Sequence, residues 1–148
     1  APETCAMILV DTGPLVALFD PRDGDHARCV KRLAMIEEPL CTTIPVLTEA
    51  FHLLSPGSIG AQRLMDFIAA GGLGVRDLDS AGLQRAFALM VRYADHPMDL
   101  ADASLVVLAE TLKLRTVFTL DRNDFTTYRI QQGHRHVAFA LILPDSAS

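Results

Sequence analysis

The stretch MILVDTGP, residues 7–14, decides the fold class because it joins a wholly apolar segment directly to the start of a helix. Four consecutive apolar residues without polar alternation are typical of a strand buried on both faces, as inside a parallel sheet. Thr12 is a good capping residue and Pro14 suits the first helical turn, so a helix is predicted to follow at once. Asp11 then lies at the carboxyl end of the strand.

The same alternation of strand and helix continues along the chain. Apolar runs predict four further strands, at residues 40–43, 73–78, 116–120 and 137–143. Apolar residues at helical spacing predict helices, at residues 12–20, 26–37, 45–54, 58–70, 80–93 and 98–112. Because strands alternate with helices, the chain is predicted to be an α/β domain with a mostly parallel sheet.

Length and composition limit the class of protein. The chain has 148 residues, half of them hydrophobic, which is enough for one domain with its own core. We expect this domain over residues 7–144, with residues 1–6 as a tail or cloning remnant and residues 145–148 as a C-terminal tail. The three cysteines form no CxxC pair, and no apolar run is long enough to span a bilayer. These features favour a reducing, cytoplasmic setting and no membrane association.

The net charge argues against general attraction to nucleic acid. The formal charge is −5 at pH 7, so a polyanionic substrate would require bound cations or a local basic patch. The positions of the acids are informative. Asp11 and Asp121 each follow a predicted strand, so both side chains are expected at the same edge of the sheet. Glu49 interrupts an apolar helical segment, while Asp99 and Asp102 are three residues apart and share one helix face. Asp121 and Asp124 are also three residues apart.

Each of these acids taken alone is better explained as a helix cap or a turn residue. Their convergence at one sheet edge is the informative feature, because clustered carboxylates repel one another unless cations neutralise them. Oxygen ligands without His or Cys favour Mg²⁺ or Mn²⁺ over zinc. The sequence therefore predicts a divalent-cation site at this edge.

Four short acidic motifs, in this order, resemble those of the PIN-domain ribonucleases, and specifically the VapC-type toxins of bacterial toxin–antitoxin pairs. The motifs are ILVDTGPLVAL at residues 8–18, VLTEA at 46–50, DLADASL at 99–105 and TLDRNDF at 119–125. The resemblance covers nearly the whole chain from Met7. It implies a PIN-like three-layer sandwich, with a five-stranded, mostly parallel sheet in the order 3-2-1-4-5 flanked by helices.

The resemblance also implies roles for individual side chains. The family's catalytic acids fall on Asp11, Glu49, Asp102 and Asp121. Of these, the three aspartates would bind Mg²⁺ or Mn²⁺, with Asp99 and Asp124 as further ligands, bound directly or through water.

Three neighbours of the acids have supporting roles. Thr12 and Thr119 would hydrogen-bond the carboxylates or a bound water. Arg122, next to Asp121, either contacts a substrate phosphate or pairs with Asp124.

The implied activity is divalent-metal-dependent hydrolysis of RNA phosphodiesters by a toxin that a small antitoxin neutralises. The antitoxin would place an Arg or a similar cation among Asp11, Glu49 and Asp102. Two alternatives remain open, a stand-alone PIN-like nuclease and a catalytically silent PIN-like module that only binds a partner. The complete set of acids argues against the silent module.

A homodimer is also expected. Apolar residues at positions 64, 65, 67 and 68 give the predicted helix over residues 58–70 a wider apolar face than one core-facing stripe requires. This helix and the one over residues 45–54 are therefore the expected interface.

Overall fold

The computed structural model describes residues 6–144, so the expected C-terminal tail at residues 145–148 and all but Ala6 of the expected N-terminal tail at residues 1–6 lie outside the described residues. The strands in this range are β1 Ile8–Val10, β2 Leu40–Thr43, β3 Gly74–Arg76, β4 Thr116–Phe118, β5 Arg129–Gln132, β6 Arg135–Ala138 and β7 Ala140–Ile142. The helices are α1 Thr12–Phe19, α2 His26–Leu33, α3 Ile44–Leu54, α4 Ile59–Ala69, α5 Ser80–Arg92, α6 Leu100–Leu112 and α7 Arg122–Thr127. No helix among residues 6–144 combines the length and apolarity needed to cross a membrane.

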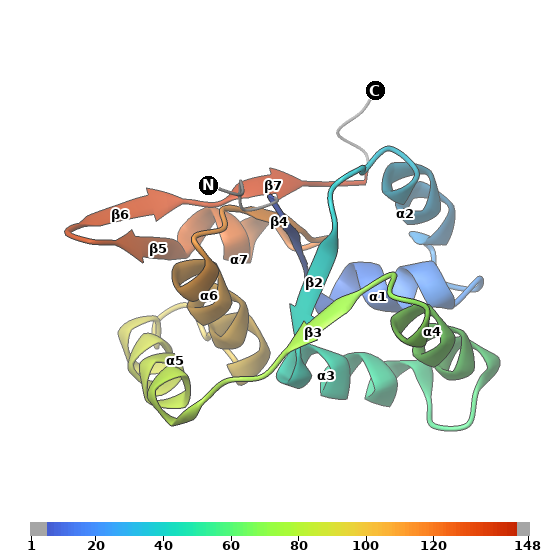
Figure 1. The fold of residues 1–148 in the computed structure, drawn as a ribbon, viewed down its shortest axis with the longest axis horizontal. Helices are drawn as coiled ribbons and strands as arrows, with labels where there is room; N and C mark the ends of the chain where they lie inside the picture. The colour runs from blue at the N-terminus through green and yellow to red at the C-terminus, as the bar shows by residue number, and fades with distance from the viewer. Residues whose placement is uncertain (1–5, 145–148) are drawn as a thin grey trace.

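A five-stranded sheet forms the centre of the molecule, with the strand order β3-β2-β1-β4-β7. All four strand pairs are parallel, and Leu9 of the central β1 pairs with Cys41 on one side and Val117 on the other. Helices α5 and α6 lie on one side of this sheet, and α1, α2 and α4 lie on the other (Figure 1). The predicted parallel α/β sandwich and its spatial strand order are confirmed.

β1 is buried along its whole length, because the helices cover both faces of the sheet. α6 crosses one face and contributes eight buried residues, which explains why its sequence is almost continuously apolar. The cysteines of the described region, Cys29 and Cys41, are free thiols inside this core.

The fifth predicted strand, residues 137–143, is wrong as a single element. Ala138 is the last residue of β6, which pairs antiparallel with β5, whereas Ala140 begins β7, which pairs parallel with β4. Between them, the buried ring of Phe139 meets the Phe125 ring edge-on, with 5.3 Å between centroids. The apolar run is continuous, so hydropathy alone could not show that its two halves belong to different sheets.

The other differences concern short elements. α7 has six residues and β5 has four, and neither shows enough periodicity to be predicted. The helix predicted over residues 26–37 ends earlier, at Leu33, and turns follow it.

Gly60 marks a close approach between α4 and the end of α1. A Cβ added here would lie 2.5 Å from the carbonyl oxygen of Phe19, a backbone atom that cannot rotate away. We expect Gly60→Ala to lower the free energy of unfolding by about 2 kcal/mol, although Ala is ordinarily the better helix former. Gly24→Ala is the control, because its added Cβ would meet no atom within 4 Å. Urea denaturation of both variants measures the difference, and equal stabilities would contradict the close approach.

Candidate active site

Asp11 sits where β1 ends and α1 begins, and two hydrogen bonds hold its carboxylate. Oδ1 accepts from the Thr12 backbone N–H at 2.8 Å, and Oδ2 accepts from the Thr119 hydroxyl at 2.9 Å. The sequence predicts Thr12 as the cap of this helix, but the capping residue is Asp11, one position earlier. The Thr12 hydroxyl oxygen is buried and has no hydrogen-bond partner among the described residues.

Thr119 links Asp11 to the second acid of the site. Its hydroxyl donates to Asp11 and accepts from the backbone N–H of Asp121 at 2.9 Å. Asp121 then caps α7, because its carboxylate accepts from the backbone N–H of Asp124 at 3.0 Å. The end of β4 and the start of α7 are thereby joined to the end of β1.

Asp99 and Asp102 come from the start of α6. Asp99 caps this helix, with its carboxylate accepting from the Asp102 backbone N–H at 2.8 Å. The Asp102 carboxylate itself accepts from the hydroxyl of Tyr128 at 2.9 Å. The ring of Tyr128 is buried and meets the rings of Tyr93 and Phe125 edge-on, so the position of its hydroxyl is well determined.

All six predicted carboxylates line one open pocket of about 580 Å³. The lining residues are Asp11, Thr12, Gly13, Glu49, Asp99, Asp102, Leu120, Asp121, Arg122, Asn123 and Asp124. Glu49 reaches it from α3, is half-buried, and makes no hydrogen bond within the described part of the chain. Thr119 does not line the pocket and is linked to it through its hydrogen bonds to Asp11 and Asp121.

Arg122 does not pair with Asp124, which was one of its two predicted roles. Asp124 instead contacts the Nε2 atom of His96 at 2.5 Å. Arg122 is exposed at the pocket and forms no ion pair with any residue between positions 6 and 144. It therefore remains available to a substrate anion.

Burial and mutual repulsion raise the pKa values of the two most enclosed acids. The pKa of Asp11 rises to about 6, chiefly because it is buried and then because Asp121 and Glu49 repel its charge. The pKa of Asp102 rises to about 8, again mainly through burial, with repulsion from Asp11 and Asp99 adding to it. Hydrogen bonds from Thr12 and Thr119 to Asp11 act in the opposite direction. At neutral pH Asp102 therefore mostly holds a proton, which a cation could replace, while Asp11 is mostly ionised.

The donor set fits a hard divalent cation, because six carboxylates line the pocket and neither His nor Cys does. The buried, unpartnered hydroxyl of Thr12 supplies a further oxygen at the same place. Within residues 6–144, however, no group of three His, Cys, Asp or Glu side chains is close enough to enclose an ion in this conformation. Side-chain rotation or bridging water would be needed to complete a coordination shell.

Tyr128 and His96 are site residues that sequence reasoning missed. Their contacts with Asp102 and Asp124 join positions 26 and 28 residues apart along the chain. Neither residue belongs to an acidic motif, and Tyr128 follows a helix too short to be predicted. Only the tertiary structure could reveal them.

Comparison with known families identifies the domain. The profile of the PIN domain family matches residues 8–130, which includes every acid of the pocket. The chain belongs to the PIN domain family. This PIN domain is 28% identical over 130 residues to Ribonuclease VapC26 of Mycobacterium tuberculosis, a match that covers 86% of this chain and 96% of the relative.

Solved structures show the same fold. The PIN domain superposes with a TM-score of 0.72 and 20% identity on M. tuberculosis VapC20, described as a toxin that cleaves the sarcin-ricin loop, over 78% of this chain and 91% of that one. A toxin–antitoxin complex from Klebsiella pneumoniae gives a TM-score of 0.62 and 20% identity, over 81% and 91% of the two chains. VapBC2 of Rickettsia felis, bound to promoter DNA, gives 0.62 and 14% identity, over 93% and 98%.

The double role of Asp121 as cap and pocket acid can be separated by two substitutions. Asn caps helices about as well as Asp but carries no charge, so Asp121→Asn should melt at or above the wild-type temperature without metal. Asp121→Ala removes the cap as well and should lower the free energy of unfolding by about 1 kcal/mol relative to Asp121→Asn. Thermal melting in chelator compares the two. A fall of several degrees for Asp121→Asn would mean that its charge stabilises the fold.

Proposed function

We propose that the chain is a divalent-metal-dependent endoribonuclease that hydrolyses RNA phosphodiesters and acts as a cytoplasmic toxin. The observation that carries the proposal is the pocket in which six carboxylates from separate parts of the chain meet, two of them with raised pKa values. Three of these acids cap helices, but capping does not require six carboxylates to meet in one pocket, where they repel one another. The similarity to a ribonuclease, and to a toxin structure described as cleaving the sarcin-ricin loop, supports the same activity.

The proposed ligands of Mg²⁺ or Mn²⁺ are Asp11, Asp102 and Asp121, with Asp99 and Asp124 bound directly or through water. When bound, the cation would lower the pKa of a coordinated water and polarise the scissile phosphate.

The protein orients these ligands through hydrogen bonds. Thr119 holds one oxygen of Asp11, and Tyr128 holds one oxygen of Asp102, so both carboxylates are fixed before substrate arrives. Glu49 has no hydrogen bond among the described residues, which leaves its carboxylate able to accept a proton from the attacking water. Arg122 stands exposed at the pocket, where its guanidinium can contact a phosphate oxygen.

The proposal is tested by incubating the purified protein with total RNA in chelator and then with Mg²⁺ or Mn²⁺. We expect no cleavage in chelator and recovery on addition of either ion. Failure to cleave RNA under every condition would favour the alternative of a catalytically silent, partner-binding module.

An antitoxin is the proposed regulator. A segment of the antitoxin would place an Arg among Asp11, Glu49 and Asp102, where it would compete with the cation for the same carboxylates. Several structures with this fold are toxin–antitoxin complexes, which is consistent with such a partner. Co-expression with the neighbouring reading frame tests the idea. A small protein that co-purifies and suppresses cleavage is expected for a toxin and not for a stand-alone nuclease.

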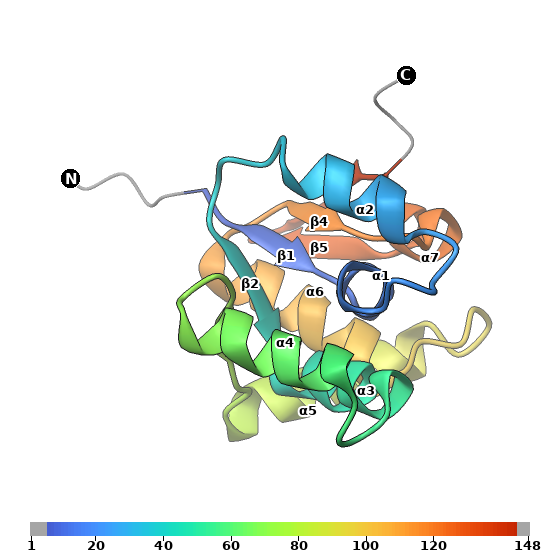
Figure 2. The same ribbon diagram turned by 90° about the vertical axis from the view of Figure 1, so that its right-hand side faces the viewer.

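The proposed homodimer rests on apolar side chains at the surface of α3 and α4, which lie side by side in the lower part of Figure 2. Leu53, Ile59 and Met65 are exposed, with Ile59 at 73%. The predicted patch is narrower than its sequence suggested, because Leu64 is buried and Phe67 packs against the Phe19 ring.

Light scattering tests this interface. We expect a dimer at micromolar concentration that Ile59→Glu combined with Met65→Glu converts to a monomer, since the buried charges would lack partners. A wild-type monomer would remove the interface from the proposal.

A further inference from the structure

Two segments that flank the acidic motif at residues 121–124 carry a net positive charge. Residues 111–120 and 125–144 contain no Asp or Glu, although the whole chain has a formal charge of −5. Their basic residues are Lys113, Arg115, Arg129, His134, Arg135 and His136. A cationic region therefore exists within an acidic protein, and its place in the fold decides whether it can act as a surface.

The fold gathers these residues on and beside the β5–β6 hairpin. The Arg115 guanidinium donates from Nε and Nη2 to the Ala138 carbonyl at 3.2 and 3.1 Å, which places residue 115 against β6. Lys113, two residues earlier, is exposed at the end of α6. Arg135 is exposed on β6 next to the turn. Figure 1 shows the hairpin projecting beyond α6, on the side of the molecule away from α2.

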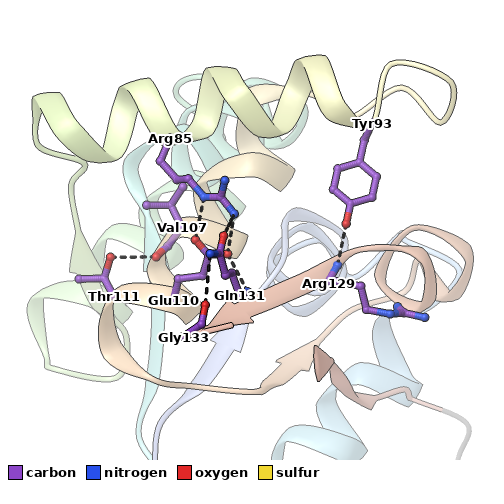
Figure 3. A network of polar contacts seen from close by, with 8 residues as sticks. All are labelled: Arg85, Tyr93, Val107, Glu110, Thr111, Arg129, Gln131 and Gly133. Carbon is purple, nitrogen blue, oxygen red and sulfur yellow. Dashed lines mark hydrogen bonds and ion pairs between the residues drawn. The ribbon is translucent and has the colours of Figure 1, made fainter. Parts of the chain in front are cut away.

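Hydrogen bonds join the hairpin to side chains of α6 and of the C-terminal part of the α5 region, as Figure 3 shows. Glu110 accepts from Nε and Nη2 of Arg85 at 3.0 and 3.1 Å, and from the backbone N–H of Gln131 at 2.8 Å. The Tyr93 hydroxyl accepts from the backbone N–H of Arg129 at 3.0 Å. Side chains therefore accept hydrogen bonds from two backbone N–H groups of β5, those of Arg129 and Gln131. These contacts hold the hairpin in a defined position.

The basic side chains divide into two groups. Arg85 is paired with Glu110, and Arg115 and Arg129 donate to backbone carbonyls. Lys113 and Arg135, by contrast, form no ion pair with any other residue in the 6–144 range. These two cations are held on an ordered scaffold and remain free for an external anion.

We propose that the β5–β6 hairpin, together with Lys113, binds the phosphate backbone of folded RNA that extends beyond the scissile bond. The proposal rests on the proposed function. The hairpin starts directly after Tyr128, whose hydroxyl contacts Asp102 in the pocket, and its four-residue strands extend roughly 13 Å. Residues 129–138 include no Phe, Tyr or Trp, so base stacking contributes little and phosphate contacts to paired RNA are favoured.

The test compares RNA binding by two Arg→Glu variants in an Asp11→Asn background, which prevents cleavage. Arg135→Glu reverses a charge on the hairpin, which forms a sheet of its own. Arg76→Glu makes the same change at an exposed position of β3, the edge strand of the main sheet opposite β7. The probes are an RNA stem-loop of about 30 nucleotides and a single-stranded RNA of about six nucleotides. Fluorescence anisotropy measures Kd for each over a range of salt concentrations.

We expect Arg135→Glu to weaken stem-loop binding at least about tenfold and to reduce the salt slope by about one, with the short RNA changed less than about twofold. Lys113→Gln should weaken the stem-loop in the same direction, and Arg76→Glu should leave it within about twofold. Unchanged stem-loop binding, an equal loss for Arg76→Glu, or an equal loss for the short RNA would each overturn the proposal. Absence of RNA cleavage by the wild-type protein would reject the nuclease activity instead, and the binding comparison would still decide the role of the hairpin.

Discussion

Asp11→Asn is expected to lower kcat/KM for RNA cleavage by at least about a thousandfold, because it removes a charged ligand from the most enclosed position in the pocket. The substitution should leave the fold intact. The Asn carbonyl can still accept from the Thr12 N–H, and the change of volume is small. Without metal the variant should melt at or above the wild-type temperature, because it removes a carboxylate whose burial is unfavourable for the charged form and raises the pKa of Asp11 to about 6.

Asp79→Asn is the matched control. Asp79 caps α5 by accepting from the Gly82 N–H at 2.7 Å, as Asp11 caps α1, but it does not line the pocket. Its variant should retain full activity. Calorimetric titration measures Mn²⁺ binding to both variants as a second test. Asp11→Asn should lose Mn²⁺ binding, and Asp79→Asn should retain it. An Asp11→Asn protein that cleaves as well as the wild type would refute the nuclease assignment.

The metal-free protein is expected to become more stable as the pH falls from 8 to 5. The pKa values of Asp11 and Asp102, about 6 and about 8, both lie above the ordinary value of 3.8. Between the ordinary and the raised pKa the folded state binds more protons than the unfolded state, so the free energy of unfolding falls as pH rises. After allowance for solvent screening in an open pocket, the gain on acidification is on the order of 2 kcal/mol.

Urea denaturation in chelator across this pH range measures the effect. Asp102→Asn should flatten the pH dependence, because the group with the largest shift no longer titrates. Saturating Mn²⁺ should reverse the trend, since the ion binds the ionised carboxylates and its binding strengthens with pH. Stability that rises with pH in chelator would show that these acids are ionised and well solvated in the folded protein.

Helix capping and site chemistry are combined in the same residues. Asp11, Asp99 and Asp121 each cap a helix, and all three also line the pocket. For each acid considered singly, the sequence left a helix cap and a site residue as competing interpretations. For Asp11 and Asp121 they coincide because the carboxyl ends of β1 and β4 lead into helix N-termini, so a capping carboxylate lies at the functional edge of the sheet. Asp99 caps α6, which follows α5, and its carboxylate reaches the same pocket from the start of that helix.

The sequence by itself determined the features that depend on neighbouring residues. The apolar run at residues 7–10 predicted a buried strand, and apolar spacing predicted a helix from residue 58, where the Ser58 hydroxyl caps α4 by accepting from the Ala61 N–H at 3.0 Å. The four acidic motifs and their order indicated the family, which the match over residues 8–130 confirms. Each of these signals is contained in a few consecutive residues, and strand burial or helix capping acts over the same short distance.

Only the tertiary structure decided which groups act on one another. The Thr119 hydroxyl reaches Asp11 across 108 residues of sequence, and the Tyr128 hydroxyl reaches Asp102 across 26. The raised pKa of Asp102 depends on burial and on charges from other elements. One apolar run divides at Phe139 between two sheets, and the Phe139 ring packs there against Phe125, a residue of α7. Such effects arise from distance and solvent exclusion in three dimensions, and the order of residues does not encode them locally.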